Sequence, residues 1–279
     1  MALADYQMGS ILITGSTGIL GKHVIARLNE IAPTFKIIEL PTDIRNFRKT
    51  KGFCEKIGAV SHVIHLAALV EINKVNANPA DAYRVNLGGT INLLTALAEL
   101  GLKPHIFMCS SSHVYSPVNI PLSEESELNP SSLYGRTKMC SEIAASDICD
   151  AHGLQLCIGR VFSMHDPDQK GSFLRPNISR RLENENLSEP FKLRGADSVR
   201  DFLSAQEVAK YVVDLSLKCF EGTINIASGK PLSVGEFVQS LSSKKLNISN
   251  IGSSNSIIAD ITKLRVFEEE YQQDEQTFD

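Results

Sequence analysis

Short apolar runs alternate with longer amphipathic stretches along most of the chain. The first run covers residues 11–13 and ends before Gly15, after which apolar residues recur at helical spacing between residues 19 and 28. A short apolar run bounded by glycine is typical of a buried strand, and a period near 3.6 is typical of an amphipathic helix. The pattern therefore predicts a strand, a tight turn and a helix.

The same alternation continues along the chain as far as residue 227. Apolar runs predict further strands at residues 35–40, 60–69, 106–109, 154–161 and 223–227, and helical periodicity predicts helices at 87–100 and 133–148. Strands that alternate with helices form parallel sheets, because each parallel connection needs a crossover. We therefore predict the α/β class, with a Rossmann-type doubly wound parallel sheet covered by helices on both faces.

The character of the sequence changes after residue 165. Residues 165–171 are polar and rich in turn formers, and residues 175–193 mix basic side chains with Asn and Glu. We predict a Rossmann domain over residues 1–165 and a smaller C-terminal lobe formed mainly by residues 166–279. Residues 223–227 would return from this lobe to the core sheet.

Composition and charge narrow the class of partner. The chain is 43% hydrophobic and 22% charged, with a net charge of -4 and scattered basic residues, which favours a small ligand over nucleic acid. Its six cysteines form no CxxC pair and are expected to be reduced. Residues 1–10 lack a signal-peptide pattern, and no stretch approaches the ~20 apolar residues that span a bilayer. These features predict a cytoplasmic protein without a membrane partner.

A glycine-rich loop joins the first predicted strand to the first predicted helix. Its three glycines have the spacing GxxGxxG, which permits a tight turn and a close approach of backbone to a ligand. Free N–H groups and the helix dipole at this point favour a pyrophosphate group. We predict that a dinucleotide contacts the loop residues Gly15, Thr17, Gly18, Ile19, Leu20 and Gly21.

An acidic residue follows this loop at a spacing that matters for the choice of dinucleotide. Glu39 closes the second predicted strand, where a carboxylate accepts hydrogen bonds from the adenosine ribose and repels a 2′-phosphate. This position favours NAD over NADP. Arg45 lies close enough in sequence to leave NADP open.

Tyr134 and Lys138 lie four residues apart on a predicted helix. Side chains at i and i+4 share one face, so the ammonium group is expected to lower the pKa of the tyrosine and make it a useful base. Taken alone, such a pair is more often an ordinary surface contact. His62 and His65 also form a pair, but residues three apart on a strand point to opposite faces, so no metal site is predicted.

The combination of motifs resembles the extended short-chain dehydrogenase/reductase family of nucleotide-sugar epimerases, dehydratases and reductases. The resemblance runs almost from end to end. In order, it rests on TGSTGILG, Asp43-Ile44, HLAA at 65–68, Asn86 in NLGGT, the serines before Val114-Tyr115, YGRTK, Arg160-Val161-Phe162, VRDF at 199–202 and Ala259-Asp260.

The resemblance implies roles for residues at the reacting centre. Tyr134 would be the general acid or base, Lys138 would activate it and bind the nicotinamide ribose, and Ser111 would steady the reacting oxygen. Arg200 would neutralise the diphosphate of a nucleotide sugar, unless it pairs with a local carboxylate. Ser112 and His113 would face the substrate, with His113 either a second acid or a simple hydrogen-bonding residue.

The resemblance also implies contacts with the cofactor. Asp43 and Ile44 would contact the adenine, and Lys138 the ribose beside the nicotinamide. Further cofactor contacts would come from Leu66, Ala67, Ala68, Asn86 and Tyr134. Relatives often dimerise through helices of the kind predicted at 87–100 and 133–148, so a homodimer is also considered.

Three departures from the family pattern limit what the resemblance implies. Asp43 follows Glu39 after an unusually short interval, which would open the adenosine end of the site. Ser112-His113 stands where dehydratases carry Asp-Glu, which disfavours dehydration. Ser163 and Asp166-Pro167 replace the family's Asn and its Gly-Pro turn, so substrate contacts from this loop are in doubt.

These observations indicate an NAD(P)-dependent enzyme that transfers hydride at a sugar carbon, with a C-terminal lobe that binds the substrate. A 4-epimerase and a 4-keto sugar reductase both fit. Two rival hypotheses are a non-catalytic dinucleotide sensor and an oxidoreductase of a non-sugar carbonyl. The complete set of Ser111, Tyr134 and Lys138 opposes the first, and Arg200 opposes the second.

Overall fold

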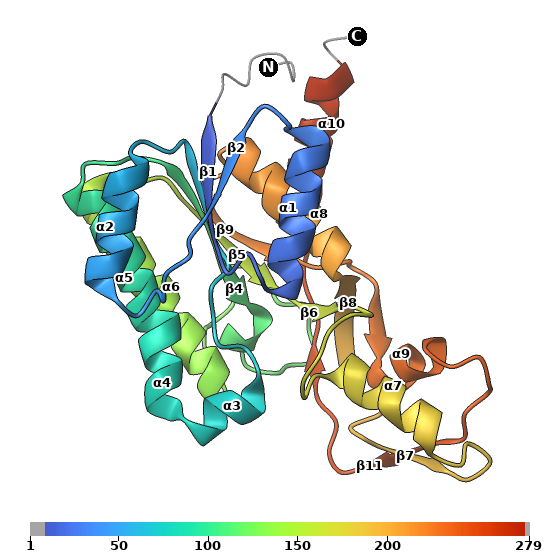
Figure 1. Cartoon of the computed structure of the whole chain (residues 1–279). Coiled ribbons are helices and arrows are strands. Elements are labelled where there is room, and N and C mark those ends of the chain that lie inside the picture. Colours follow the sequence, from blue (N-terminus) through green and yellow to red (C-terminus); the bar gives the residue numbers. More distant parts are fainter. Residues whose placement is uncertain (1–8, 277–279) are drawn as a thin grey trace.

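The core of the protein is a parallel sheet of six strands in the order β2-β1-β3-β4-β5-β9 (Figure 1). The computed structural model describes residues 9–276, and it describes side chains as far as residue 270. The strands are β1 (Ser10–Thr14), β2 (Lys36–Glu39), β3 (His62–His65), β4 (His105–Ser111), β5 (Leu156–Val161) and β9 (Gly222–Ile226). Each neighbouring pair is parallel, which confirms the predicted Rossmann-type sheet.

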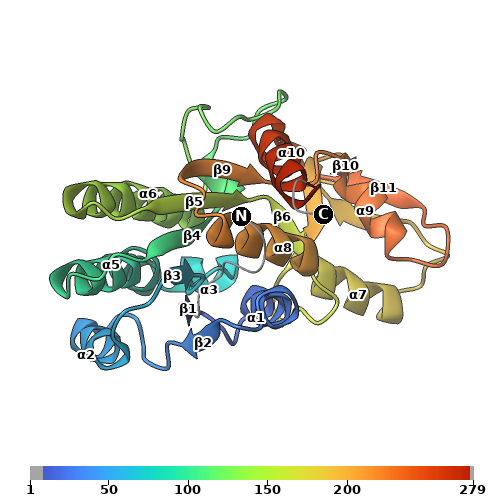
Figure 2. The same ribbon diagram turned by 90° about the horizontal axis from the view of Figure 1, so that it is seen from above.

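Helices cover both faces of this sheet, as Figure 2 shows from above. One face carries α2 (Phe47–Ile57), α5 (Gly89–Glu99) and α6 (Leu133–His152), and the other carries α1 (Ile19–Ile31) and α8 (Ala205–Leu217). Alternation along β1 explains the two layers, because Ile11 and Ile13 pack in one hydrophobic cluster and Leu12 in the other. A strand buried on both faces therefore reads as a continuous apolar run.

Shorter helical segments lead into α5. They are α3 (Ile72–Ala77), α4 (Pro79–Tyr83) and a π-helical turn at Arg84–Gly88. A 3₁₀ turn, Ser112–Val114, follows β4. Neither α2 nor α7 (Leu174–Asn184) was predicted, because polar and charged residues make up most of each helix. Few side chains of these helices are buried: Thr50 and Cys54 in α2, and Ile178 in α7.

The C-terminal lobe packs beside one end of the sheet (Figure 1). Strand β8 (Val199–Ser204) pairs with β6 (Ser163–His165), β10 (Pro231–Ser233) and β12 (Ser256–Ile257), and β7 (Phe191–Arg194) pairs with β11 (Ile248–Ile251). Helices α7 and α9 (Val234–Ser240) cover them around a separate hydrophobic cluster. The lobe thus has its own small core.

More of the C-terminal half returns to the central sheet than the sequence predicted. The predicted return, residues 223–227, corresponds to β9, but α8 also packs against α1, and α10 (Thr262–Gln276) packs against β9. The Rossmann core is therefore assembled from both halves of the chain. Among the described residues, no helix is both long and apolar enough to cross a membrane. The prediction about a signal peptide concerns residues 1–10, of which 1–8 lie outside the described range.

Candidate functional site

A cavity of about 790 Å³ lies where the carboxyl ends of β1, β3 and β4 meet the C-terminal lobe. In open parallel sheets a ligand binds beyond the carboxyl ends of the strands, at the point where the strand order reverses. Of the residues that the sequence predicted for the site, the lining includes Gly15, Thr17, Gly18, Ile19, Leu20, Gly21, Leu66, Ala67, Ala68, Ser111, His113, Tyr134 and Arg200. The fold thus brings residues from distant parts of the chain around one space.

The glycine-rich loop is shaped by close packing as well as by its backbone angles. Gly15 has a φ of 73°, and a Cβ there would lie 2.7 Å from the backbone nitrogen of Ala67. A Cβ at Gly21 would collide with the carbonyl oxygen of Gly15. Helix α1 begins without a side-chain cap at Gly18 and without an acidic residue in its first turn. Its first N–H groups and its dipole are therefore suited to an anionic group.

Asn86 supports the wall of the cavity from behind. Its buried side chain accepts a hydrogen bond from Leu69 N at 2.7 Å and donates to the Leu69 carbonyl at 3.1 Å and to Thr137 Oγ1 at 2.8 Å. It does not line the cavity. The predicted contact between Asn86 and a cofactor stays a prediction, whereas its hydrogen bonds hold the segment after β3 in place.

The residues predicted to bind the adenosine end of the cofactor, at and after β2, do not line the cavity. Glu39 is exposed at the end of β2, while Asp43 pairs with Arg45 at 2.6 Å and Ile44 is buried against Gly89. The contacts predicted for Asp43 and Ile44 therefore stay predictions. Arg45 also pairs with Asp81 at 2.5 Å, so two carboxylates already hold its guanidinium group.

The predicted catalytic residues converge at the start of α6. Ser132 caps this helix through a 3.0 Å hydrogen bond from Gly135 N, and Gly135 lies so close to the His113 carbonyl that no Cβ would fit. The ring of Tyr134 meets the ring of His113 edge to face, with 5.5 Å between centroids. One turn later, Lys138 Nζ donates to the Cys109 carbonyl at 2.6 Å. Lys138 is buried and is not among the residues that line the cavity, so its predicted contact with the cofactor stays a prediction.

Burial controls the ionisation of this pair. Burial raises the pKa of Tyr134, and a hydrogen bond with Ser111 opposes that rise only in part. Burial also lowers the pKa of Lys138. The pKa of Tyr134 therefore lies above its ordinary value in the protein alone, opposite to the predicted direction, because desolvation of the phenolate outweighs the hydrogen bond with Ser111.

The predicted substrate residues differ in their access to the cavity. Arg200 lines it and donates to the Val199 carbonyl at 2.8 Å and to Asn255 O and Oδ1 at 2.9 and 2.5 Å. Among the described residues its guanidinium group has no carboxylate partner, so the alternative of a local salt bridge is not observed. His113 lines the cavity, and burial and Arg200 lower its pKa, which favours the neutral ring. Ser112 is buried outside the lining.

Several residues of the C-terminal lobe that the sequence did not single out also line the cavity. Arg175 donates to Nδ1 of His165 at 2.7 Å, and Phe202 stacks on Phe237 with 4.0 Å between centroids. Lys170 completes the cationic lining, and among the described lining residues none is Asp or Glu. The run of basic residues after position 174 was the one available signal, but it did not distinguish Arg175 from its neighbours.

A short segment of residues 166–172 spans from the lobe to the core beside this cavity. At one end, Asp166 Oδ2 meets His23 Nε2 of α1 at 2.8 Å. At the other, the Glu71 carboxylate accepts hydrogen bonds from Ser172 Oγ at 2.6 Å and Ser172 N at 3.2 Å. We call residues 166–172 the strap. It ties the lobe to the Rossmann core at two points.

Comparison with known proteins identifies relatives that are similar to this protein over most of its chain. The profile of the NAD dependent epimerase/dehydratase family matches residues 11–227. A putative UDP-glucose 4-epimerase of Methanocaldococcus jannaschii is 28% identical over 251 residues, covering 81% of this chain and 79% of that protein. A GDP-6-deoxy-D-talose 4-dehydrogenase of Aggregatibacter actinomycetemcomitans is 30% identical over 238 residues, covering 83% and 78%.

The fold is also similar to solved structures. The structure of RMD from Pseudomonas aeruginosa, complexed with NADPH, superimposes with a TM-score of 0.81 at 23% identity and covers 92% of this chain and 91% of that one. At this identity the likeness concerns the arrangement of strands and helices. It agrees with the Rossmann-type core and C-terminal lobe described above.

Proposed function

Because the chain belongs to the NAD dependent epimerase/dehydratase family, we propose that it transfers hydride reversibly at a carbon of a nucleotide-diphosphate sugar. The observation that carries this proposal is that the glycine loop, Ser111, Tyr134 and Arg200 line one cavity. Arg200 has no carboxylate partner among the described residues. Such a reaction needs three features in one place: a helix N-terminus that binds an anion, a group that transfers a proton, and cationic side chains that bind the substrate.

The residues of the chain would share the work as follows. NAD, when bound, supplies hydride exchange at its nicotinamide ring. The N–H groups of the glycine loop hold its pyrophosphate, and Lys138 holds the nearby ribose. Tyr134 takes the proton from a sugar hydroxyl when that carbon is oxidised and returns it when the carbonyl is reduced, while Ser111 hydrogen-bonds the reacting oxygen.

The adenosine end supports NAD over NADP. Glu39 at the end of β2 would repel a 2′-phosphate. Arg45, the residue that could have accommodated this phosphate, is held by Asp43 and Asp81 instead. A preference for NAD supports an epimerase, which keeps its cofactor through both half-reactions. A 4-keto sugar reductase is the second candidate, supported by the similar sugar-nucleotide dehydrogenase among the relatives.

The cationic lining supports a nucleotide sugar over a smaller carbonyl compound. Arg175, Arg200 and Lys170 face the cavity without an acidic neighbour among the described lining residues. Charge-assisted hydrogen bonds from arginine suit the oxygens of a diphosphate. A neutral carbonyl substrate would supply no negative charge to these cations. A dinucleotide sensor would not need the Ser111, Tyr134 and Lys138 set.

The assembly and location are part of the proposal. Ile91 of α5 and Ile143 of α6 are exposed apolar side chains on the two helices predicted to mediate a homodimer. A dimer in sedimentation that Ile143→Lys dissociates would support that interface, and a monomeric wild-type protein would refute it. The six cysteines are free, which supports a reducing, cytoplasmic location.

The first experiment is to denature purified protein, identify the released nucleotide, and then test a panel of UDP-, GDP- and dTDP-sugars with and without added NADH or NADPH. Tightly bound NAD and interconversion of two sugars without net oxidation would establish an epimerase. Stoichiometric consumption of reduced cofactor by a keto sugar would establish a reductase. Absence of both bound and usable cofactor would refute the proposed function.

A further inference from the structure

A buried ion pair lies directly behind the catalytic residues. Glu142 of α6 and Arg160 of β5 have side chains that are 4% and 7% exposed, and Arg160 Nη2 lies 2.8 Å from Glu142 Oε2. Arg160 Nε is 3.2 Å from each carboxylate oxygen, so the contact is a two-point one. Such geometry fixes orientation as well as distance.

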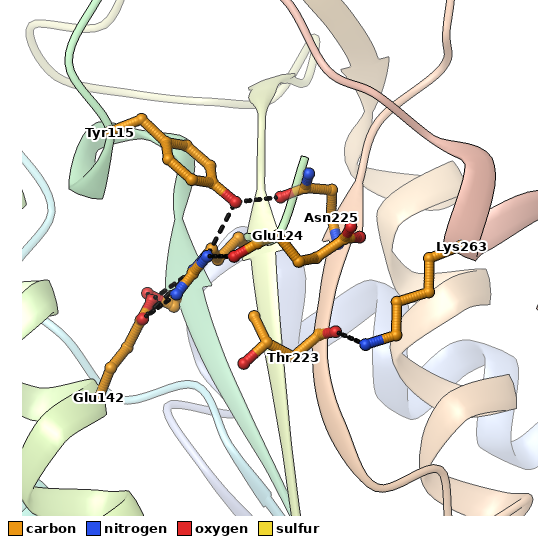
Figure 3. Close-up of polar contacts among 8 residues, drawn as sticks. Tyr115, Glu124, Glu142, Thr223, Asn225 and Lys263 are labelled. Carbon is orange, nitrogen blue, oxygen red and sulfur yellow. Dashed lines mark hydrogen bonds and ion pairs between the residues drawn. The ribbon is translucent and has the colours of Figure 1, made fainter. Parts of the chain in front are cut away.

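The pair is the centre of a wider network, shown in Figure 3. Arg160 Nη1 donates to the Tyr115 hydroxyl and to the Glu124 carbonyl, both at 2.9 Å. The Tyr115 hydroxyl donates to Asn225 Oδ1 at 2.8 Å. Strands β5 and β9 and the segment after β4 are thereby joined to one side chain of α6.

Glu142 also contacts the strand that carries the catalytic serine. The Ser110 hydroxyl donates a short hydrogen bond to Glu142 Oε1, and Ser110 precedes Ser111 at the end of β4. Adjacent residues on a strand point to opposite sides, so a side-chain contact made by Ser110 fixes the backbone from which Ser111 extends. This contact joins β4 to α6 at the level of the reacting centre.

On α6 itself, Glu142 follows Lys138 and Tyr134 at intervals of four residues. Positions i, i+4 and i+8 lie along one helix face. Lys138 is held by the Cys109 carbonyl, the residue before Ser110 on β4. Two successive residues of β4 therefore receive one contact each from two successive turns of α6.

We propose that Glu142 is a positioning residue, which fixes the end of β4 against α6 and thereby sets the geometry between Ser111 and the Tyr134–Lys138 pair. This inference rests on the proposed function for the identity of the reaction. The carboxylate suits the task because it accepts from Ser110 and Arg160 simultaneously. An apolar side chain at position 142 would fill the same space without fixing the direction of the contact. Because a buried ion pair adds little stability compared with a well-packed apolar replacement, positioning is the better explanation for the carboxylate.

The charge of Glu142 has a second effect on the pair. Burial lowers the pKa of Lys138, and the Cys109 and Glu142 side chains oppose this change. The groups that interact electrostatically with Lys138 are Cys109 on β4, the neutral His65 on β3 and Glu142 on its own helix. Replacing the carboxylate with an amide would remove this opposing charge and therefore lower the pKa of Lys138 further.

Two substitutions separate positioning from folding. Glu142→Gln removes the charge while keeping the side chain's shape, and Ser110→Ala removes the hydrogen bond that Ser110 of β4 donates to Glu142 of α6. Glu124→Gln is the matched control, because the Glu124 side chain accepts from Asn225 N at 2.7 Å and belongs to the same network. Among the described residues, no hydrogen bond or ion pair joins this side chain to α6. Each variant is measured for thermal midpoint, NADH affinity by fluorescence, kcat and KM.

We expect Glu142→Gln and Ser110→Ala to lower kcat by about 10- to 100-fold, with NADH affinity and KM within about threefold of wild type, since misplaced reacting groups reduce turnover more than binding. Glu124→Gln should keep its kcat. Equal kcat in wild type and both variants, or the same loss in Glu124→Gln, would overturn the inference. If Glu142→Gln does not fold, Ser110→Ala alone decides the outcome.

A substrate-free readout keeps the inference separate from the proposed function. Lysines labelled with carbon-13 at Cε can be titrated by NMR, with the Lys138 signal assigned through Lys138→Met. The Lys138 pKa should fall in Glu142→Gln and stay unchanged in Glu124→Gln. An unchanged value in both would count against Glu142. Failure of the wild-type protein to turn over any nucleotide sugar would instead refute the proposed function.

Discussion

Burial acts in opposite directions on the two ionisable groups at the start of α6. It raises the pKa of the Tyr134 phenol and lowers that of the Lys138 ammonium, so both neutral forms are favoured. The Ser111 hydrogen bond and the Glu142 carboxylate oppose these two effects. Proton transfer at this site thus depends on neighbouring groups that offset desolvation of each charge.

Replacement of Tyr134 by Phe tests the proton-transfer role directly. The ring would keep its edge-to-face contact with His113 and lose only the hydroxyl. We expect kcat to fall by about 10²- to 10⁴-fold, the usual contribution of general acid–base catalysis, with NAD binding retained. Stopped-flow measurement of cofactor reduction would check this, and a variant that keeps more than about a tenth of the wild-type rate would contradict the role.

Arg200 is expected to act through substrate binding. Arg200→Gln should raise KM for a nucleotide sugar by about 10- to 100-fold with a smaller change in kcat, because a hydrogen bond to a charged group contributes roughly 1.5–3 kcal/mol. Arg200→Lys should recover part of the loss, since it restores the charge without the planar fork. Arg194→Gln, at an exposed position of β7 in the same lobe, is the control. Equal KM values for all four proteins would exclude Arg200 from binding.

At the scale of elements, the strap connects the C-terminal lobe to the Rossmann core beside the cavity. Its Asp166 end is tied to α1, and its Ser172 end is tied to the residue that precedes α3. Lys170 lies between these ties and lines the cavity. Hydrogen bonds from Lys74 and, second, from Ser172 lower the pKa of Glu71 to about 2, so the carboxylate is charged near neutral pH.

Glu71→Gln should loosen the strap and speed release of a bound dinucleotide by several-fold, because the charged acceptor for Ser172 is lost. Lys74→Gln is the matched control: it removes the 2.7 Å ion pair with Glu71 but keeps both bonds to Ser172. Release would be followed by the fluorescence of displaced NADH. Identical release rates in wild type and Glu71→Gln would show that the strap does not retain the cofactor.

For the whole molecule, buried histidines link stability to pH. Burial lowers the pKa of His62 to about 4 and that of His65 to about 3, against 6.5 in the unfolded chain. Between these values the unfolded state binds protons that the folded state does not. The free energy of unfolding should therefore be highest above pH 6.5 and fall as the pH decreases toward 4.

The expected loss is on the order of 3 kcal/mol for His62 alone, at roughly 1.4 kcal/mol per unit of pKa difference. Denaturant unfolding at pH 7, 6, 5 and 4 would measure it. His62→Gln should make the dependence shallower, whereas His152→Gln, at an exposed position, should leave it unchanged. A wild-type stability that is constant between pH 7 and 4 would contradict the expectation.

The sequence by itself determined the features that depend on neighbours along the chain. The strand, turn and helix around Gly15, the parallel alternation up to β5, and the shared helix face of Tyr134 and Lys138 all follow from local spacing. Glycine positions and apolar periods are encoded within a few residues. The predicted Rossmann-type sheet could therefore be reached without a structure, whereas the choice of Ser111 as a partner of Tyr134 came from the family resemblance.

Only the tertiary structure decided the contacts between distant segments. Helix α8 returns to α1, Arg175 meets His165 in the cavity wall, and Glu142 meets Arg160 behind it. Burial in the folded protein also raises the pKa of Tyr134, whereas the sequence predicted that it would be lowered. The physical reason is common to all of these: burial and long-range pairing depend on what packs around a side chain, and that environment is created only when the whole chain folds.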